Sequence, residues 1–148
     1  MRTNILCIFL FLFIGCGKKD NSNTYDGPQI PFLKTTWIFA SLKNNKTSSI
    51  IPYPDNIAKK EVIIFDSLNI LSVGGTCNGC QFKYAIGSND SIALVGNGIC
   101  TLIQCENINW EDSLMRNLGG AYAYKIYGNN LVIYTKGINN LNFVSASN

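Results

Sequence analysis

The stretch Gly74–Cys105, GGTCNGCQFKYAIGSNDSIALVGNGICTLIQC, decides how this chain folds. It holds four of the six cysteines, together with many glycine, asparagine and serine residues that favour turns. Phe82, Tyr84 and Ile86 alternate with Gln81, Lys83 and Ala85, which is the period of a half-buried strand. The stretch therefore predicts an antiparallel β-meander that disulfide bonds hold together.

The segments on both sides of this stretch also predict short strands. Turn signals such as Gly87-Ser88-Asn89-Asp90 and Gly96-Asn97-Gly98 recur about every eight to twelve residues, which is typical of antiparallel β-structure. Residues 43–55 predict a loop, because Pro52 and Pro54 exclude a regular helix. The expected strands lie at 32–42, 59–65, 70–73, 82–86, 92–94, 99–104, 121–126, 131–134 and 141–143.

One helix is expected, over residues 109–119. Asn109 is a good N-cap residue, and Asp112 three positions later completes the cap. Trp110, Leu114 and Leu118 recur at four-residue spacing and form one apolar stripe. A helix of this length is not stable alone in water, so we expect it to pack on the sheet.

The composition argues against some classes of function but does not identify one. The 148 residues are enough for one domain, and no histidine is present, so the commonest general base and metal ligand is missing. Charged residues make up only 14% of the chain. Without residues 1–15, which contain Arg2 alone among the charged types, 11 basic and 9 acidic residues leave a net charge of +2. This weak charge argues against a nucleic-acid partner.

The N-terminus has the features of an export signal. Arg2 precedes the apolar run Ile5–Ile14, which as a helix of ten residues spans about 15 Å, half of a bilayer core. Such a short run predicts a signal peptide over residues 1–15 rather than a membrane span. Phe13-Ile14-Gly15-Cys16 resembles the lipobox of bacterial lipoproteins, in which the thiol and the new amino terminus of the cysteine are acylated.

We therefore expect a lipid anchor on Cys16, which carries palmitate-type chains into a membrane. Residues 16–30 are polar and predict an acylated flexible tether, and residues 31–148 are the folded domain. The expected location is the bacterial cell envelope, on the periplasmic or surface side. An ordinary cleaved signal peptide with a chance cysteine is the alternative.

Four cysteines remain after Cys7 leaves with the signal peptide: Cys77, Cys80, Cys100 and Cys105. In an oxidising compartment an even number of thiols predicts disulfides, here two with three possible connectivities. The nested pair Cys77–Cys105 and Cys80–Cys100 suits antiparallel segments, whereas Cys77–Cys80 with Cys100–Cys105 makes two local loops. A redox dithiol at Cys77-Asn78-Gly79-Cys80 and a structural zinc site are the sharper alternatives.

The order of motifs resembles the META domain of bacterial heat-shock-type envelope lipoproteins. An early strand tryptophan, Trp37, is followed by Gly-x-Cys-Asn at 75–78, Thr-x-x-x-Cys at 101–105 and a helix E-x-x-L-x-x-x-L at 111–118. The corresponding family-motif residues are Trp37, Cys77, Asn78, Thr101, Cys105, Glu111 and Leu118, and the motifs Tyr-x-Ile-x-Gly-x-x-Leu at 124–131 and Leu-x-Phe at 141–143 complete the series.

The resemblance implies an α+β fold with a curved antiparallel sheet, here of about seven to nine short strands, and one packed helix. It also favours a Cys77–Cys105 bridge, so we expect the nested pairing, with Cys80–Cys100 as an added cross-link. The family is linked in general to envelope stress and antibiotic resistance. No enzymatic activity and no cofactor or metal is expected.

Two further groups of residues need an interpretation, the tyrosines and the acidic residues. The tyrosines can line a ligand surface or serve in sheet packing: Tyr84, Tyr122, Tyr124, Tyr127 and Tyr134. The acids Asp66, Asp90, Glu111 and Asp112 are expected in turns and at a helix start rather than as a catalytic pair. The function predicted is an anchored envelope lipoprotein that binds an unidentified envelope protein or component and supports stress tolerance. The alternative is a lipocalin-like carrier of a small apolar ligand.

Overall fold

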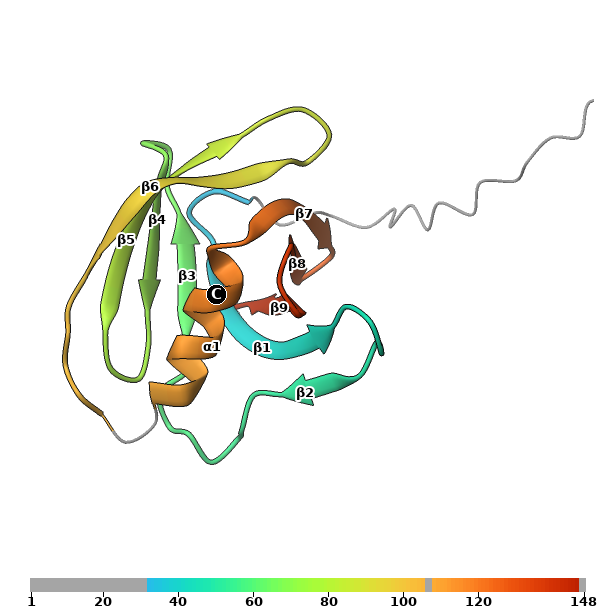
Figure 1. Cartoon of the computed structure of the whole chain (residues 1–148). Coiled ribbons are helices and arrows are strands. Elements are labelled where there is room, and N and C mark those ends of the chain that lie inside the picture. The colour runs from blue at the N-terminus through green and yellow to red at the C-terminus, as the bar shows by residue number, and fades with distance from the viewer. Residues whose placement is uncertain (1–31, 106–107, 147–148) are drawn as a thin grey trace, which may run out of the picture.

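The computed structural model describes residues 32–105 and 108–146, which form nine strands and one helix. Figure 1 shows their arrangement. In chain order they are β1 (Thr36–Asn44), β2 (Ile50–Pro52), β3 (Val62–Phe65), β4 (Ile70–Gly74), β5 (Gly79–Ile86), β6 (Ile92–Cys100), α1 (Ile108–Leu118), β7 (Ala121–Tyr127), β8 (Asn130–Thr135) and β9 (Asn139–Ser145).

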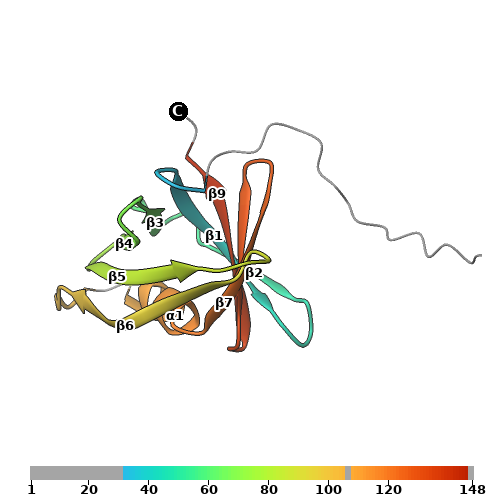
Figure 2. The ribbon, with the colours of Figure 1, turned by 90° about the horizontal axis from the view of Figure 1, so that it is seen from above.

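The strands form one antiparallel sheet in the order β6-β5-β4-β3-β1-β9-β8-β7, with β2 beside β1. The sheet curls into a half-barrel, so that its two end strands approach each other (Figure 2). They meet where Ser91 pairs with Ala123 and where the Tyr124 N–H donates to the Asp90 carbonyl oxygen at 2.9 Å. One face of the sheet is therefore concave and lies inside the curl.

Alternating side chains fill this concave face, as the period of two requires. Leu71 and Val73 of β4 point inward, and so do Leu131 and Ile133 of β8. The largest fully buried side chains are Trp37, Phe39, Phe65, Phe143, Ile63, Leu71, Leu114, Leu118, Leu131, Ile133, Leu141 and Glu61.

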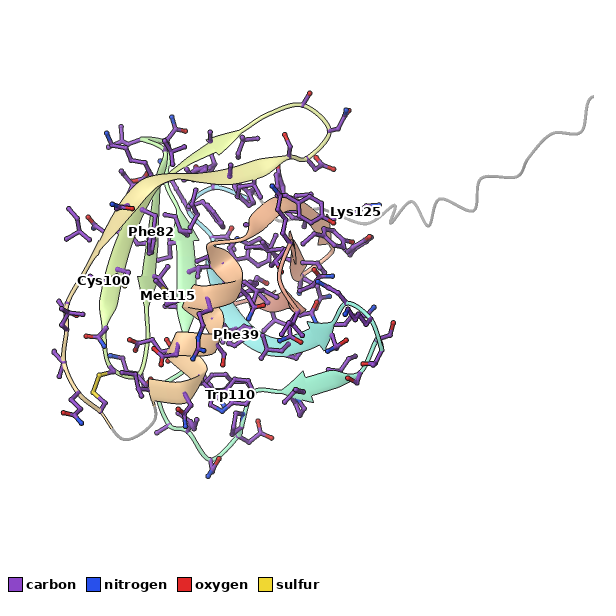
Figure 3. The ribbon with its side chains drawn as sticks, in the orientation of Figure 1. Phe39, Phe82, Cys100, Trp110, Met115 and Lys125 are labelled. Atoms are coloured by element: carbon purple, nitrogen blue, oxygen red, sulfur yellow. A yellow bond between two sulfur atoms is a disulfide. The ribbon has the colours of Figure 1, made fainter. Side chains whose placement is uncertain are left out.

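Helix α1 lies inside the curl of the sheet (Figure 2). Its apolar stripe is directed at the core, where Leu114 and Leu118 are buried and Trp110 and Met115 pack at the margin. Figure 3 places Phe39 of β1 between the helix and the sheet. The helix thus closes the concave face.

The expectation of an α+β fold is wrong. The chain is mostly β, because the strands far outweigh one helix of 11 residues. The helix also begins one residue earlier and ends one residue earlier than expected. Asn109 lies within its first turn and is therefore not the N-cap, contrary to the prediction.

Two local predictions on the β-structure are also wrong. Gly96-Asn97-Gly98 is not a turn between two strands, because β6 runs continuously from Ile92 to Cys100 and its register against β5 shifts at these residues. Gly96 has a φ of 71°, which a glycine adopts at little cost and which lets the strand bulge. The expected loop at 43–55 contains the short strand β2, which pairs with the end of β1.

The predicted signal peptide, the lipidation site Cys16 and the tether lie outside the described residues, as does all of residues 1–31. Among the residues that the structure describes, no helix is long and apolar enough to cross a membrane.

Candidate functional site

Asn78 is the centre of a polar cluster at one end of the sheet, between β4 and β5. Its backbone N–H and its side-chain amide both donate to the Glu111 carboxylate of α1, at 2.9 and 2.8 Å. Its side-chain oxygen accepts from the Ile103 N–H at 2.7 Å and from the Thr101 hydroxyl at 3.1 Å. One asparagine therefore joins β5, the segment that follows β6, and the first turn of the helix.

Two disulfides border this polar cluster. Cys77 is bonded to Cys105 and Cys80 to Cys100, which is the nested pairing. Cys80 and Cys100 are direct cross-strand partners on β5 and β6. Figure 3 shows a disulfide at the lower left of the molecule, beside the segment that follows β6. The bridges and Asn78 fix the same loop by covalent and by polar contacts.

Glu61 supplies a second carboxyl group on the other side of the loop. Its side chain is fully buried, at 0% exposure, and its Oε1 accepts from the Thr76 hydroxyl at 2.6 Å and from the Thr76 N–H at 3.2 Å. Its Oε2 has no hydrogen-bond partner among the described residues. Burial raises the pKa of Glu61, and the nearby charge of Glu111 raises it further, while the Thr76 hydrogen bonds act in the opposite direction.

Tyr53 covers this acidic region from the loop after β2. Its ring packs on Trp110 with centroids 5.2 Å apart and on Phe39 at 5.8 Å, and the Lys60 ammonium lies 4.9 Å from the ring centroid. Burial first, and then the charge of Glu61, raise the pKa of Tyr53 to about 12. The two carboxyl groups themselves are buried, with 0% of Glu61 and 6% of Glu111 exposed.

The structure brings most of the predicted motif residues into this one cluster. Asn78 and Thr101 hydrogen-bond each other, Glu111 holds Asn78, and Cys77 and Cys105 are joined. Trp37 and Leu118 lie apart from it in the core, and the Trp37 indole N–H donates to the Phe32 carbonyl oxygen at 3.3 Å.

The arrangement of the cysteines in the described residues does not fit a redox dithiol or a structural zinc site. Cys77 and Cys80 are bonded to Cys105 and Cys100, so the two cysteines of the CxxC segment are not joined to each other. Within residues 32–105 and 108–146, no three cysteine or carboxylate side chains are grouped as a metal site would require.

The remaining acids each have a local contact. Asp66 accepts from the Leu68 and Ile70 N–H groups at 2.8 Å in the turn between β3 and β4. Asp112 faces Arg116 at 3.7 Å along the helix, and Asp90 lies in the turn between β5 and β6. Glu111 differs from the expectation, because its carboxylate binds the Asn78 loop rather than capping its own helix.

The five tyrosines named above divide between the two faces of the sheet. Tyr84 and Tyr124 lie inside with Phe32 and Phe65, where ring centroids are 4.2 to 6.5 Å apart. Tyr122, Tyr127 and Tyr134 lie on the hairpin β7–β8, with Tyr122 and Tyr134 6.4 Å apart. The tyrosines therefore form two separate aromatic groups rather than one surface.

Sequence analysis missed Glu61 and Tyr53. Glu61 precedes β3 and has the same parity as Ile63 and Phe65, which are fully buried. That parity predicts that the Glu61 side chain points inward. Gly75 leaves space for this side chain, because a Cβ at position 75 would overlap the Glu61 carboxyl group. The hydrogen bonds of this cluster hold the Asn78 loop, and its two carboxyl groups, Glu61 and Glu111, are buried.

No protein family model matches the chain, and no curated protein matches it either. Two solved structures are similar in fold. The crystal structure of a DUF4847 family protein from Bacteroides vulgatus has 14% identity and a TM-score of 0.60, over 76% of this chain and 93% of that one. The NMR structure of a protein from Burkholderia xenovorans has 13% identity and a TM-score of 0.62, over 89% and 99% of the two chains. At these identities the likeness extends to the fold alone.

Proposed function

We propose that this protein is a membrane-anchored lipoprotein of the cell envelope, whose META-like domain binds an envelope component and takes part in stress tolerance without catalysis. The observation that carries the proposal is the pair of nested disulfides, Cys77–Cys105 and Cys80–Cys100. Disulfides of this kind form and persist in oxidising compartments outside the cytoplasm. This agrees with the export signal and with Cys16 at its end.

The closed nature of the polar cluster supports a binding role rather than an enzymatic one. Glu61 and Glu111 are buried; Thr76 donates to one oxygen of Glu61, and Asn78 donates to both oxygens of Glu111. Carboxyl groups used in this way stiffen a loop and do not reach a substrate. A rigid, disulfide-linked sheet suits a domain that presents a surface to a partner.

The lipocalin-like alternative has less support. A carrier of an apolar ligand needs an apolar cavity inside the curled sheet. Leu114 and Leu118 of α1 occupy that position here and pack against Phe39, Leu131 and Phe143 of the core. We therefore place the binding surface on the outside of the sheet.

The anchor is tested by Cys16→Ser in the full chain. We expect this variant to leave the membrane fraction, because no acyl chain is attached, whereas Cys7→Ser stays membrane-bound because Cys7 lies within the cleaved segment. Ultracentrifugation of cell extracts followed by immunoblotting measures both. A Cys16→Ser protein that sediments with membranes as the parent does would contradict the proposal.

A further inference from the structure

Three tyrosines and a lysine form an aromatic surface on the hairpin β7–β8. We call Tyr122, Lys125, Tyr127 and Tyr134 the tyrosine surface. The Tyr122 and Tyr134 ring centroids are 6.4 Å apart, and the Lys125 ammonium lies 5.1 Å from the centroid of Tyr127. Burial first, and then the Tyr127 side chain, raises the pKa of Tyr134 to about 12.

These side chains lie on the outside of the sheet. Tyr124 and Ile126 of β7 pack against the core, and so do Leu131 and Ile133 of β8, which leaves the alternate residues Lys125, Tyr127 and Tyr134 on the outer face. Tyr122 joins them beside Tyr134 because the register of β7 against β8 shifts between Ala121 and Ala123. Tyr122 is 47% exposed. Figure 3 shows Lys125 on the outer side of β7.

A groove continues the tyrosine surface toward β6, where the two ends of the curled sheet approach each other. Tyr122 belongs to both the tyrosine surface and the groove. The groove is lined by small and apolar side chains and by one charged residue, Lys136; among its lining residues are Ile86, Ser91, Ala93, Ala121, Tyr122 and Lys136. An extended ligand can therefore contact aromatic rings and then enter a groove with a positive charge.

The charges on this half of the sheet have one sign. Residues 121–146 contain Lys125 and Lys136 and no acidic residue, and β1 adds Lys43. Among the described residues, neither Lys125 nor Lys136 has a carboxylate partner within salt-bridge distance. One acid, Asp90, lies in the turn that meets β7. The surface is therefore complementary to an anion.

We propose that the tyrosine surface and the adjoining groove bind an anionic polysaccharide. Sugar rings present apolar C–H faces that stack on tyrosine, and their acidic groups meet Lys125 and Lys136. The proposal rests on the envelope function above and names the class of its binding partner. A nucleic acid combines rings and charge too, but two lysines neutralise few phosphates, and the disulfides favour a compartment outside the cytoplasm.

The test uses the full chain in detergent and four defined probes, measured by isothermal titration calorimetry. Oligogalacturonate supplies rings and carboxylates, its fully methyl-esterified form supplies rings alone, and polyglutamate supplies carboxylates alone. Single-stranded oligothymidylate represents nucleic acid. We expect oligogalacturonate to bind about tenfold or more tightly than each of the other three, which is a difference readily resolved.

Variants then locate the site. Tyr122→Ala and Lys125→Gln should each weaken oligogalacturonate binding by about threefold to tenfold, whereas Tyr122→Phe keeps the ring and should bind as the parent does. Lys83→Gln removes an exposed lysine from β5, on the other half of the sheet, and is the matched control. Asp90→Asn removes the nearby acid and should leave binding equal or tighter.

Several results would overturn the proposal. These are no binding of oligogalacturonate, equal binding of polyglutamate or oligothymidylate, or an equal loss in Lys83→Gln and Lys125→Gln. Circular dichroism of each variant checks that the fold is retained. Failure of the membrane anchor would appear in the fractionation of Cys16→Ser and would leave these binding measurements unchanged, so the two proposals fail separately.

Discussion

A glutamate at position 61 is an unusual choice for the interior of so small a protein. Transferring a carboxyl group from water is costly unless hydrogen bonds replace its hydration. Thr76 supplies two such bonds to one oxygen, while the other oxygen faces Gly75. The Gly-Thr pair of the loop is therefore matched to Glu61, with the threonine as donor and the glycine as the space for the carboxyl group.

We predict that Gly75→Ala destabilises the protein by about 1–3 kcal/mol, the usual cost of overpacking. The added Cβ would overlap the Glu61 carboxyl group, which is buried and accepts two hydrogen bonds from Thr76. Urea denaturation followed by circular dichroism measures the free energy of unfolding.

Gly74→Ala is the matched control for this residue. A Cβ at Gly74 meets nothing within 4 Å, so the same chemical change one position earlier should alter stability by less than about 0.5 kcal/mol. Equal losses of stability in the two variants would show that the glycines are needed for their backbone freedom. Overlap with the Glu61 carboxyl group would then not explain the effect of Gly75→Ala.

At the scale of elements, helix α1 depends on its contacts for stability. A helix of 11 residues is marginal alone in water, so it forms here because both of its sides are engaged. Its first turn holds the Asn78 loop through Glu111, and its apolar stripe fills the concave face of the sheet. The helix thus connects the polar cluster with the core.

We predict that Leu114→Ala costs about 2–5 kcal/mol, as expected for a large side chain removed from a closed core. Leu114 is 0% exposed, whereas Leu68 in the turn between β3 and β4 is 79% exposed. Leu68→Ala is the same substitution in solvent and should be nearly neutral. Thermal and urea unfolding compare the two, and a small effect at Leu114 would mean that the helix contributes little to the fold.

At the scale of the whole molecule, the buried acid makes stability depend on pH. The folded-state pKa of Glu61 is raised above its ordinary value of 4.5, mainly because burial disfavours the charged form. The folded protein therefore holds this proton more tightly than the unfolded chain does. The favourable contribution is complete below the unfolded pKa and is lost as pH rises through the folded pKa.

We accordingly predict that the free energy of unfolding falls as pH rises from about 4.5 through the raised folded-state pKa of Glu61, by an amount that Glu61→Gln removes. Glutamine keeps an oxygen to accept from Thr76 and stays neutral at every pH. Urea unfolding at a series of pH values measures both proteins. Parallel pH profiles for the parent and the variant would contradict the prediction.

Much of the β-structure follows from local sequence pattern. Alternation such as Phe82-Lys83-Tyr84 predicts a strand because a half-buried strand needs an apolar side chain at every second position. The same reasoning fails at Gly96–Gly98, where glycine allows either a turn or a bulge and only the pairing with β5 selects the bulge. The same reasoning overestimates the contribution of the helix to the fold class, because that contribution depends on how many strands form around the helix.

Local sequence is enough to predict the strand-rich pattern, the position of one short helix and the set of cysteines available for bridging. These features depend on residues that are near one another in the chain, or on their number. The folded chain alone shows that Glu61 and Glu111 enclose the Asn78 loop, and that the tyrosines separate onto two faces. Those contacts join residues far apart in sequence, and the curl of the sheet, which no local pattern specifies, is what brings them together.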